Sequence, residues 1–114
     1  MDVSGNPNQY INQGKINQHI NQSLDLLNHA YLEKKLSEKS YNSIYDVIED
    51  LAADLEGLGT MFPKRDMEDI SDDVTDTCDA IHQIGWDDGD FKAVQPVNKE
   101  LRKIGSYFYA MGQR

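Results

Sequence analysis

Apolar residues along this chain recur every three or four positions, which is the period of an α-helix. The first such stretch runs from about Tyr10 to Leu36, and its stripe consists of Ile16, Ile20, Leu24, Leu27 and Tyr31. No segment alternates between apolar and polar residues with the period of two that marks a strand, and β-branched residues are sparse. The pattern therefore predicts an all-α fold.

Two further stripes predict a second and a third helix. The second begins at a serine cap, Ser37 or Ser40, and ends at Gly57 or Gly59. Its apolar arc consists of Tyr41, Ile44, Tyr45, Ile48, Leu51, Ala52, Leu55 and Leu58. The third has Pro63 in its first turn. Its stripe consists of Met67, Ile70, Val74, Cys78 and Ile81, with Ile84 at the edge.

A fourth helix runs from about residue 96 to 111, after a short turn containing Phe91 and Val94 that closes one end of the bundle. Its buried residues are Val97, Leu101, Ile104 and Phe108, and its outer residues are Lys99, Arg102 and Lys103. The short link of residues 59–63 makes the second and third helices antiparallel neighbours. We therefore expect a disordered tail over residues 1–9 and a single domain over residues 10–114, a small antiparallel bundle of about four helices.

The acidic residues are concentrated in one segment. Of the twenty Asp and Glu residues, ten lie between Asp66 and Asp90, and this segment contains no Lys or Arg. In the third helix they lie opposite the apolar stripe, at Glu68, Asp69, Asp72, Asp73, Asp76 and Asp79. Seven pairs of these acids, counted from Asp66, have helical spacing, and together they destabilise the helix by about 2–3 kcal/mol. Two interpretations stay open: a binding surface, or a solvated face that keeps the protein soluble.

The second helix adds to this acidity. Its outer acids are Asp46, Glu49, Asp50 and Glu56, with Asp54 at the boundary of the apolar arc. Because the two helices are expected to be antiparallel neighbours, their acids are predicted to form one continuous surface. Along the third helix there is roughly one negative charge per 3 Å of axis, close to the roughly 3.4 Å between phosphates along one DNA strand.

Charge also divides along the chain. Residues 1–40 carry a net charge of 0, residues 41–91 a net charge of −13, and residues 92–114 a net charge of +4. Either the last helix lies beside the acidic helices and partly neutralises them, or the molecule has two faces of opposite sign. For a compact bundle we expect the first arrangement.

The sequence contains no motif for catalysis, a metal or a cofactor. The nearest approach to a metal-binding pattern is Asp79-x-x-His82, on the polar side of its helix, while His19 and His29 have no ligand spacing around them. The acids at 87, 88 and 90 lack the pattern of a calcium-binding loop. Cys78 lies on an apolar stripe and is predicted to be a small core residue. We therefore expect a protein that is not an enzyme.

Localisation and ligand class follow from the overall charge. No apolar run approaches the roughly 18 residues that span a bilayer, and the opening residues lack the features of a signal peptide, so we expect a cytoplasmic protein. A net charge of −9 and a pI near 4.5 argue against nucleic acid or an anionic membrane as a direct ligand. The expected partner is a basic protein.

Aromatic residues offer a second kind of contact. Trp86 lies in an acidic loop, and Tyr107, Phe108 and Tyr109 are consecutive, so at least one tyrosine is expected to be exposed. Trp86, Tyr107 and Tyr109 are candidate contacts for a partner or for a second copy of the chain, so the oligomeric state stays open and a homodimer is one alternative. The other interpretation is that Trp86 closes the bundle end and the tyrosines edge the core.

The leading hypothesis is a binding protein that inhibits a nucleic-acid-binding protein or nuclease by occupying its basic groove. Small acidic proteins encoded by phages act in this way on restriction or CRISPR machinery, and immunity proteins cover nucleases; the analogy is one of surface and size. The alternative is an adaptor, secretion chaperone or assembly subunit that binds through apolar and aromatic surface. The residues predicted to contact the partner are Asp46, Glu49, Asp50, Asp69, Asp72, Asp73, Asp76, Asp79, Trp86, Asp87 and Asp88.

Overall fold

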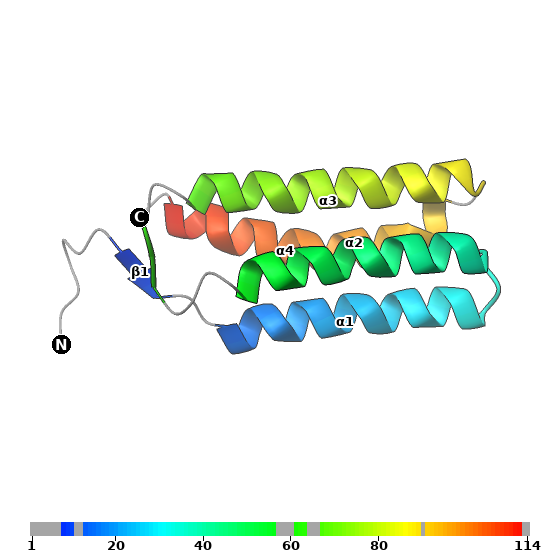
Figure 1. The fold of residues 1–114 in the computed structure, drawn as a ribbon, viewed down its shortest axis with the longest axis horizontal. Helices are drawn as coiled ribbons and strands as arrows, with labels where there is room; N and C mark the ends of the chain where they lie inside the picture. The colour runs from blue at the N-terminus through cyan, green and yellow to red at the C-terminus, as the bar shows by residue number, and fades with distance from the viewer. Residues whose placement is uncertain (1–7, 11–12, 57–60, 64–66, 90, 113–114) are drawn as a thin grey trace.

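The computed structural model describes residues 8–10, 13–56, 61–63, 67–89 and 91–112. Within them lie four α-helices, namely α1 (Gln13–Leu32), α2 (Glu38–Glu56), α3 (Met67–Asp87) and α4 (Gln95–Gly112), and a short 3-10 helix, η2 (Phe91–Val94). Successive α-helices run in opposite directions along one bundle axis (Figure 1). The predicted all-α fold, a small antiparallel bundle of about four helices, is confirmed.

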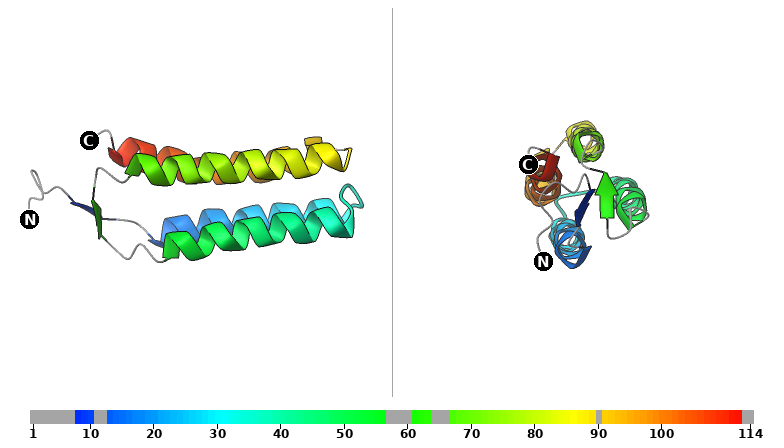
Figure 2. Two further views of the ribbon diagram at one scale, coloured as in Figure 1. Left: turned by 45° about the horizontal axis from the view of Figure 1, so that its top comes forward. Right: turned by 90° about the vertical axis from the view of Figure 1, so that its left-hand side faces the viewer.

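The helices form a ring in which each packs against the two that neighbour it. α3 lies between α2 and α4, and α1 lies between the same two helices on the opposite side, as the end view in Figure 2 shows. The apolar stripes meet along the axis, where the largest fully buried side chains are Phe108, Ile16, Leu27, Ile44, Ile48, Leu55, Ile81, Leu101, Ile104, Val74 and Val94. None of the described helices has the length and apolarity needed to cross a membrane.

A small antiparallel strand pair, which the sequence did not predict, lies at one end of the bundle. β1 (Asn8–Tyr10) pairs with β2 (Met61–Pro63), with Asn8 opposite Pro63 and Tyr10 opposite Met61. The predictions that Tyr10 begins the first helix and that Pro63 lies in the first turn of the third are therefore wrong. Of the predicted disordered tail, residues 1–7 lie outside the described residues, and Asn8 and Gln9 belong to β1.

The end of α1 explains why its predicted boundary at Leu36 was too late. Lys34 has a positive φ of 62°. The Lys34 N–H donates to the Tyr31 carbonyl and the Lys35 N–H donates to the Ala30 carbonyl, both at 2.9 Å, which is a Schellman termination of the helix. Glycine is the usual residue at such a position, and its absence here removed the sequence signal. Leu36 is nevertheless buried against the core.

The start of α2 matches one of the two predicted caps. The Ser37 hydroxyl accepts a hydrogen bond from the Ser40 N–H at 3.2 Å, so Ser37 is the capping residue. The predicted turn before α4 is also confirmed, as η2, with Val94 fully buried. The predicted end of α2, at Gly57 or Gly59, lies outside the described residues, and α2 is described to Glu56.

The buried faces of the helices follow the predicted stripes, except that the buried face of α1 is rotated and Tyr45 of the predicted arc of α2 is exposed. All four predicted core residues of α4 are buried, and Cys78 is confirmed as a core residue, with burial raising the pKa of its thiol to about 11. On α1, however, the small residues Ser23 and Ala30 are buried, while Leu24 is only half-buried. The buried Ser23 hydroxyl donates to the Ile20 carbonyl at 2.7 Å, which satisfies it inside the core.

Candidate interaction surfaces

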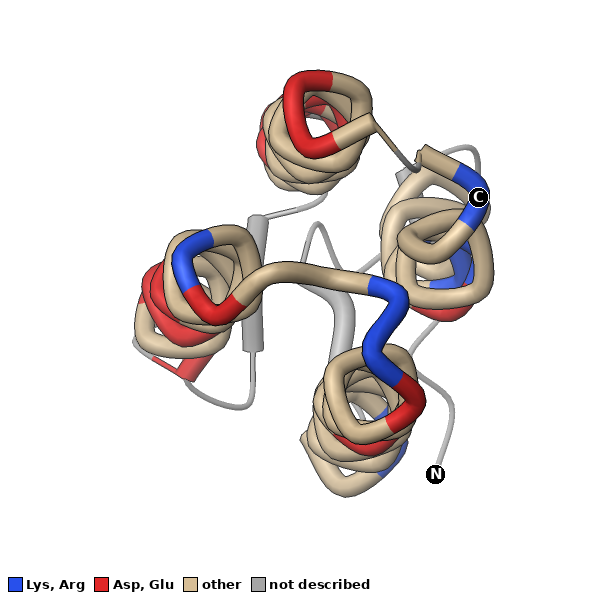
Figure 3. The backbone as a smooth tube through the Cα atoms, turned by 90° about the vertical axis from the view of Figure 1, so that its right-hand side faces the viewer, with Lys and Arg blue, Asp and Glu red and all other residues tan. Residues whose placement is uncertain are grey.

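The outer faces of α2 and α3 carry a group of exposed carboxylates that we call the acidic surface. Viewed along the bundle, Figure 3 shows that α3 carries acidic positions and no basic ones, while basic positions mark α4. The acidic surface consists of eight exposed residues, Asp46, Asp50, Asp54, Asp69, Asp72, Asp73, Asp76 and Asp79. Seven of these were predicted to contact a partner, and Asp54 was not.

The two helices bring part of this surface together across a groove of about 330 Å³. Asp50 and Asp54 of α2 line one wall, and Asp73 and Asp76 of α3 line the other. The rest of the lining is apolar or hydroxylic, from Val47, Leu51, Thr77 and Ala80. Carboxylates that are about twenty residues apart in the sequence thus share one concave surface. Asp54, which was predicted to lie at the boundary of the apolar arc, is one of them.

The charges in this groove repel one another. The pKa of Asp73 is raised, first by partial burial and then by the charges of Asp54, Asp76, Asp69 and Asp72. Since Asp54 lies on α2 and the others on α3, the crowding extends across the helix interface. The ion pairs of His19 with Glu100, Lys35 with Glu33 and Lys103 with Glu100 all lie outside the acidic surface, and the described lining of the groove contains no Lys or Arg.

The carboxylates are spread along the groove rather than converging on one point. In the described part of the chain, no three His, Cys, Asp or Glu side chains are placed to hold a metal ion together.

Three of the predicted acids lie elsewhere and already have local partners. Glu49 is exposed beside Tyr45, and its charge and the hydrogen bond between them raise the pKa of that phenol. The Asp87 carboxylate accepts a hydrogen bond from Gln83 Nε2 at 3.0 Å. The Asp88 carboxylate accepts one from the Ser37 N–H at 3.0 Å and so joins the end of α3 to the start of α2. Asp88 therefore has a structural contact as well as an exposed position.

Trp86 is exposed, with 59% of its surface accessible. Its ring packs at 6.4 Å from the His82 ring and 5.2 Å from the Phe91 ring, forming a small aromatic cluster where α3 meets η2. Trp86 thus lies near the end of α3 and not in the predicted loop, and it is exposed, whereas Ala93 and Val94 of η2 are buried. Tyr109 is 54% exposed, which confirms that at least one of the consecutive tyrosines faces solvent.

The opposite side of the bundle carries a second groove, of about 660 Å³, between α1 and α4. We call it the basic groove, and its lining residues are Lys15, His19, Lys99, Arg102, Lys103, Ser106, Tyr107 and Ala110. The expectation that the last helix lies beside the acidic helices is confirmed, because α4 packs against α3. The α4 residues Lys99, Arg102 and Lys103 line the groove toward α1, and Arg102 also lines a groove between α3 and α4. The groove between α2 and α3 is thus acidic and the groove between α1 and α4 is basic, while partial neutralisation of α3 by α4 stays a prediction.

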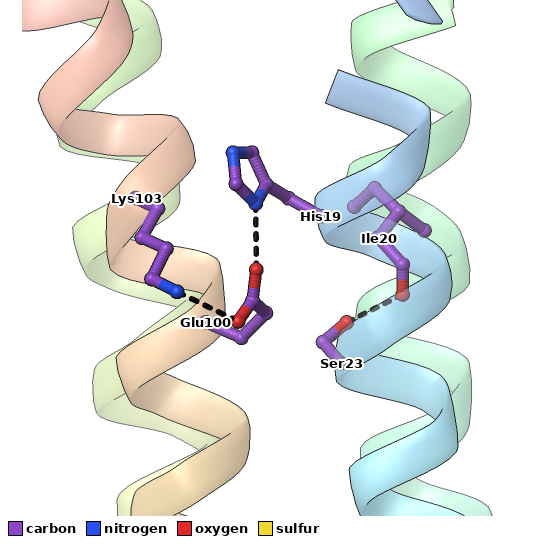
Figure 4. Close-up of polar contacts among 5 residues, drawn as sticks. All are labelled: His19, Ile20, Ser23, Glu100 and Lys103. Carbon is purple, nitrogen blue, oxygen red and sulfur yellow. Dashed lines mark hydrogen bonds and ion pairs between the residues drawn. The ribbon is translucent and has the colours of Figure 1, made fainter. Parts of the chain in front are cut away.

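A buried carboxylate underlies this groove. Glu100 is only 7% exposed, and it accepts hydrogen bonds from His19 Nδ1 at 2.6 Å and from Lys103 Nζ at 3.1 Å (Figure 4). Burial pushes the pKa of Glu100 upward, but the hydrogen bonds and charges of these two donors hold it below its usual value. Sequence reasoning missed this contact, although Glu100 lies beside the predicted core residues of its helix.

Similarity to other proteins does not assign a function to these surfaces. Comparison with known proteins finds no matching protein-family model, no matching curated protein and no matching solved structure.

Proposed function

We propose that this chain is a non-enzymatic inhibitor whose acidic surface occupies the basic groove of a protein that handles nucleic acid. The observation that carries the proposal is the groove between α2 and α3, where Asp50 and Asp54 face Asp73 and Asp76 without a basic neighbour. Such crowding destabilises the isolated molecule, and Lys and Arg side chains of a partner would relieve it.

The mechanism is competition for cationic side chains. A protein that binds DNA or RNA holds the phosphates mainly with Lys and Arg, and carboxylates at similar spacing pair with the same side chains. The field of the acidic surface would speed the encounter, and salt would slow it. A nuclease, a restriction enzyme or a CRISPR effector in the cytoplasm is the kind of target that fits this chemistry, and so is a nuclease held inactive by its immunity protein.

The test compares two variants with the same change in net charge. The groove variant carries Asp50→Asn, Asp54→Asn, Asp73→Asn and Asp76→Asn. The control variant neutralises four exposed acids outside the acidic surface, through Asp25→Asn, Glu33→Gln, Glu38→Gln and Glu56→Gln. Each immobilised protein is exposed to an extract of the cells in which it acts, at about 20 mM and at about 0.5 M salt, where the Debye length is roughly 20 Å and 4 Å.

We expect wild type and the control variant to capture the same nucleic-acid-binding protein at low salt, and the groove variant to capture at least about tenfold less of it. Added duplex DNA or structured RNA should release the captured protein, because both ligands compete for one groove. Equal capture by the groove variant, or a captured protein that nucleic acid does not displace, would contradict the proposal. Circular dichroism checks that the variants are folded.

The exposed aromatic cluster supports a second candidate, an adaptor that binds a partner through Trp86. Contacts of this kind depend on apolar area and persist in salt. Capture that survives about 0.5 M salt, where charges are screened beyond roughly 4 Å, and that is lost in a Trp86→Ala variant but kept in the groove variant would select this function over inhibition.

A further inference from the structure

The basic groove is unusual in a chain of net charge −9. Five of its lining side chains are Lys, Arg or His, and Glu100 pairs with two of them, His19 and Lys103. Neither Lys99 nor Arg102 forms an ion pair within the described part of the chain. Cations collected on one face, away from the many available acids, indicate an anionic occupant.

The groove is long enough for an extended partner surface. At one end of its cationic row is Lys99, and at the other Lys15, which lies 5.6 Å from the centre of the Tyr107 ring. From residue 99 to residue 107 a helix rises about 12 Å. The acids of α3, from Asp69 to Asp79, extend over about 15 Å of helix. The two charged rows have similar lengths and opposite signs.

These rows cannot meet within one molecule. The acidic surface lies over α2 and α3, and the basic groove lies between α1 and α4, on the far side of the bundle. They can meet between two molecules, because the row of acids along α3 of one copy and the row of cations in the basic groove of the next have opposite charge.

From this complementarity we propose that the basic groove binds the acidic surface of a second copy of the same chain. The contact is heterologous, joining different faces of the two copies, so each pair retains one free acidic surface and one free basic groove. Assembly is therefore head-to-tail and open-ended. Salt screens the attraction between the two charged rows, so the contact forms at low salt. It must also overcome the repulsion between copies of net charge −9, so it forms at high protein concentration.

Self-association and the proposed inhibition use the same acidic surface and therefore compete. The basic groove, in contrast, is needed for self-association alone. A variant of this groove thus separates the two proposals: it should lose assembly and still capture the inhibited partner. This inference goes beyond the proposed function and stands if the inhibition proposal fails.

The experiment is sedimentation velocity across protein concentration at about 20 mM and about 0.5 M salt. Wild type should exceed the 13.0 kDa monomer mass at low salt, in a concentration-dependent way, and return to it at high salt. The basic-groove variant, Lys15→Gln, Lys99→Gln and Arg102→Gln, leaves the buried Glu100 contacts in place and should remain monomeric. A matched control, Lys34→Gln, Lys39→Gln and Lys92→Gln, should still associate.

A mixture of two variants gives the decisive result. The groove variant (Asp50→Asn, Asp54→Asn, Asp73→Asn, Asp76→Asn) loses half of the eight carboxylates of its acidic surface and keeps its basic groove intact, and the basic-groove variant keeps its acidic surface intact. Each should be monomeric alone, and together they should form a one-to-one dimer that grows no further. A wild type that is monomeric in all conditions, association that persists in either variant alone, or a mixture that stays monomeric would overturn the proposal.

Discussion

Glu100 is the residue with the most constrained chemistry in the bundle. It is buried at the interface of α1 and α4, and its two carboxylate oxygens accept from donors on both helices, His19 and Lys103. A buried carboxylate whose two oxygens both accept hydrogen bonds stabilises the fold only while it is ionised and both donors are present. The contact between His19 and Glu100, two residues that are 81 positions apart in the sequence, therefore ties α1 to α4.

Replacing this carboxylate should reveal its pH dependence. Because the pKa of Glu100 is lowered in the folded protein, its contribution to stability is present above the unfolded pKa and is lost as the pH falls through the folded pKa. Glu100→Gln should lower the free energy of unfolding by about 1–3 kcal/mol at neutral pH. The difference from wild type should shrink as the pH falls below about 4, in urea unfolding followed by circular dichroism.

Glu33→Gln provides the control for this measurement. The pKa of Glu33 is also lowered, by its hydrogen bond and charge interaction with Lys35, but this pair is exposed to solvent. Its replacement should have little effect on unfolding at any pH, because solvent screens an exposed pair. An equal loss of stability in both variants would show that burial of Glu100 adds nothing to its contact with His19.

At the level of elements, the close approach of η2 to α3 depends on a glycine. A Cβ atom built on Gly85 would lie 2.8 Å from Val94 Cγ2 and 3.2 Å from the Phe91 Cα atom, both in η2. Backbone so close cannot withdraw without moving the whole segment. The absence of a side chain at Gly85 thus lets η2 cover the end of the core, where Val94 is fully buried.

This packing reverses the usual effect of replacing a helical glycine. Gly→Ala within a helix ordinarily stabilises by about 0.5–1 kcal/mol, but Gly85→Ala should destabilise by about 1–3 kcal/mol because of the clash with η2. Gly105→Ala is the comparison, since its nearest neighbour, Val74 Cγ1, would lie at 3.3 Å and is the end of a side chain. Thermal unfolding of both variants should show the larger loss at Gly85, and a stabilised Gly85→Ala would refute this account.

Helices could be predicted where apolar residues repeat with a regular period. Features that depend on a single contact with a distant part of the chain could not. The apolar core residues of α4 repeat over about three turns and were all predicted, whereas β1 and β2 have three residues each, too few to show a period of two. The same division holds for the surfaces. The acids of α3 follow from helical periodicity, but the positions of Asp54 in the acidic groove and of Glu100 beneath the basic one depend on contacts with other helices.

For the whole molecule, the separation of charge onto two faces is the dominant electrostatic property. Acids of α2 and α3 line one groove of the bundle, and Lys99, Arg102 and Lys103 of α4 line the groove toward α1. Packing of the hydrophobic core therefore keeps the like charges on each face close together despite their mutual repulsion. Added salt should therefore increase the free energy of unfolding of the monomer, because it screens the repulsion within each face. The same salt should weaken association between copies.

Asp73 is the residue at which this repulsion can be measured. Its pKa is raised by partial burial and by four neighbouring carboxylates, so its charged form disfavours the folded state above the unfolded pKa, and this penalty is relieved as the pH falls through the folded value. Asp73→Asn should therefore raise the free energy of unfolding at neutral pH and low salt, by about 0.5 kcal/mol for an exposed site.

The gain should diminish at about 0.5 M salt and below about pH 4, because screening and protonation remove the same repulsion. Urea unfolding at low protein concentration keeps association out of the measurement. Asp25→Asn, an exposed acid on α1 that lies outside the acidic surface, should show no such gain. If Asp73→Asn left stability unchanged at low salt while Asp25→Asn raised it, the charges on α2 and α3 would not be in conflict, and the strain that a basic partner is proposed to relieve would not exist.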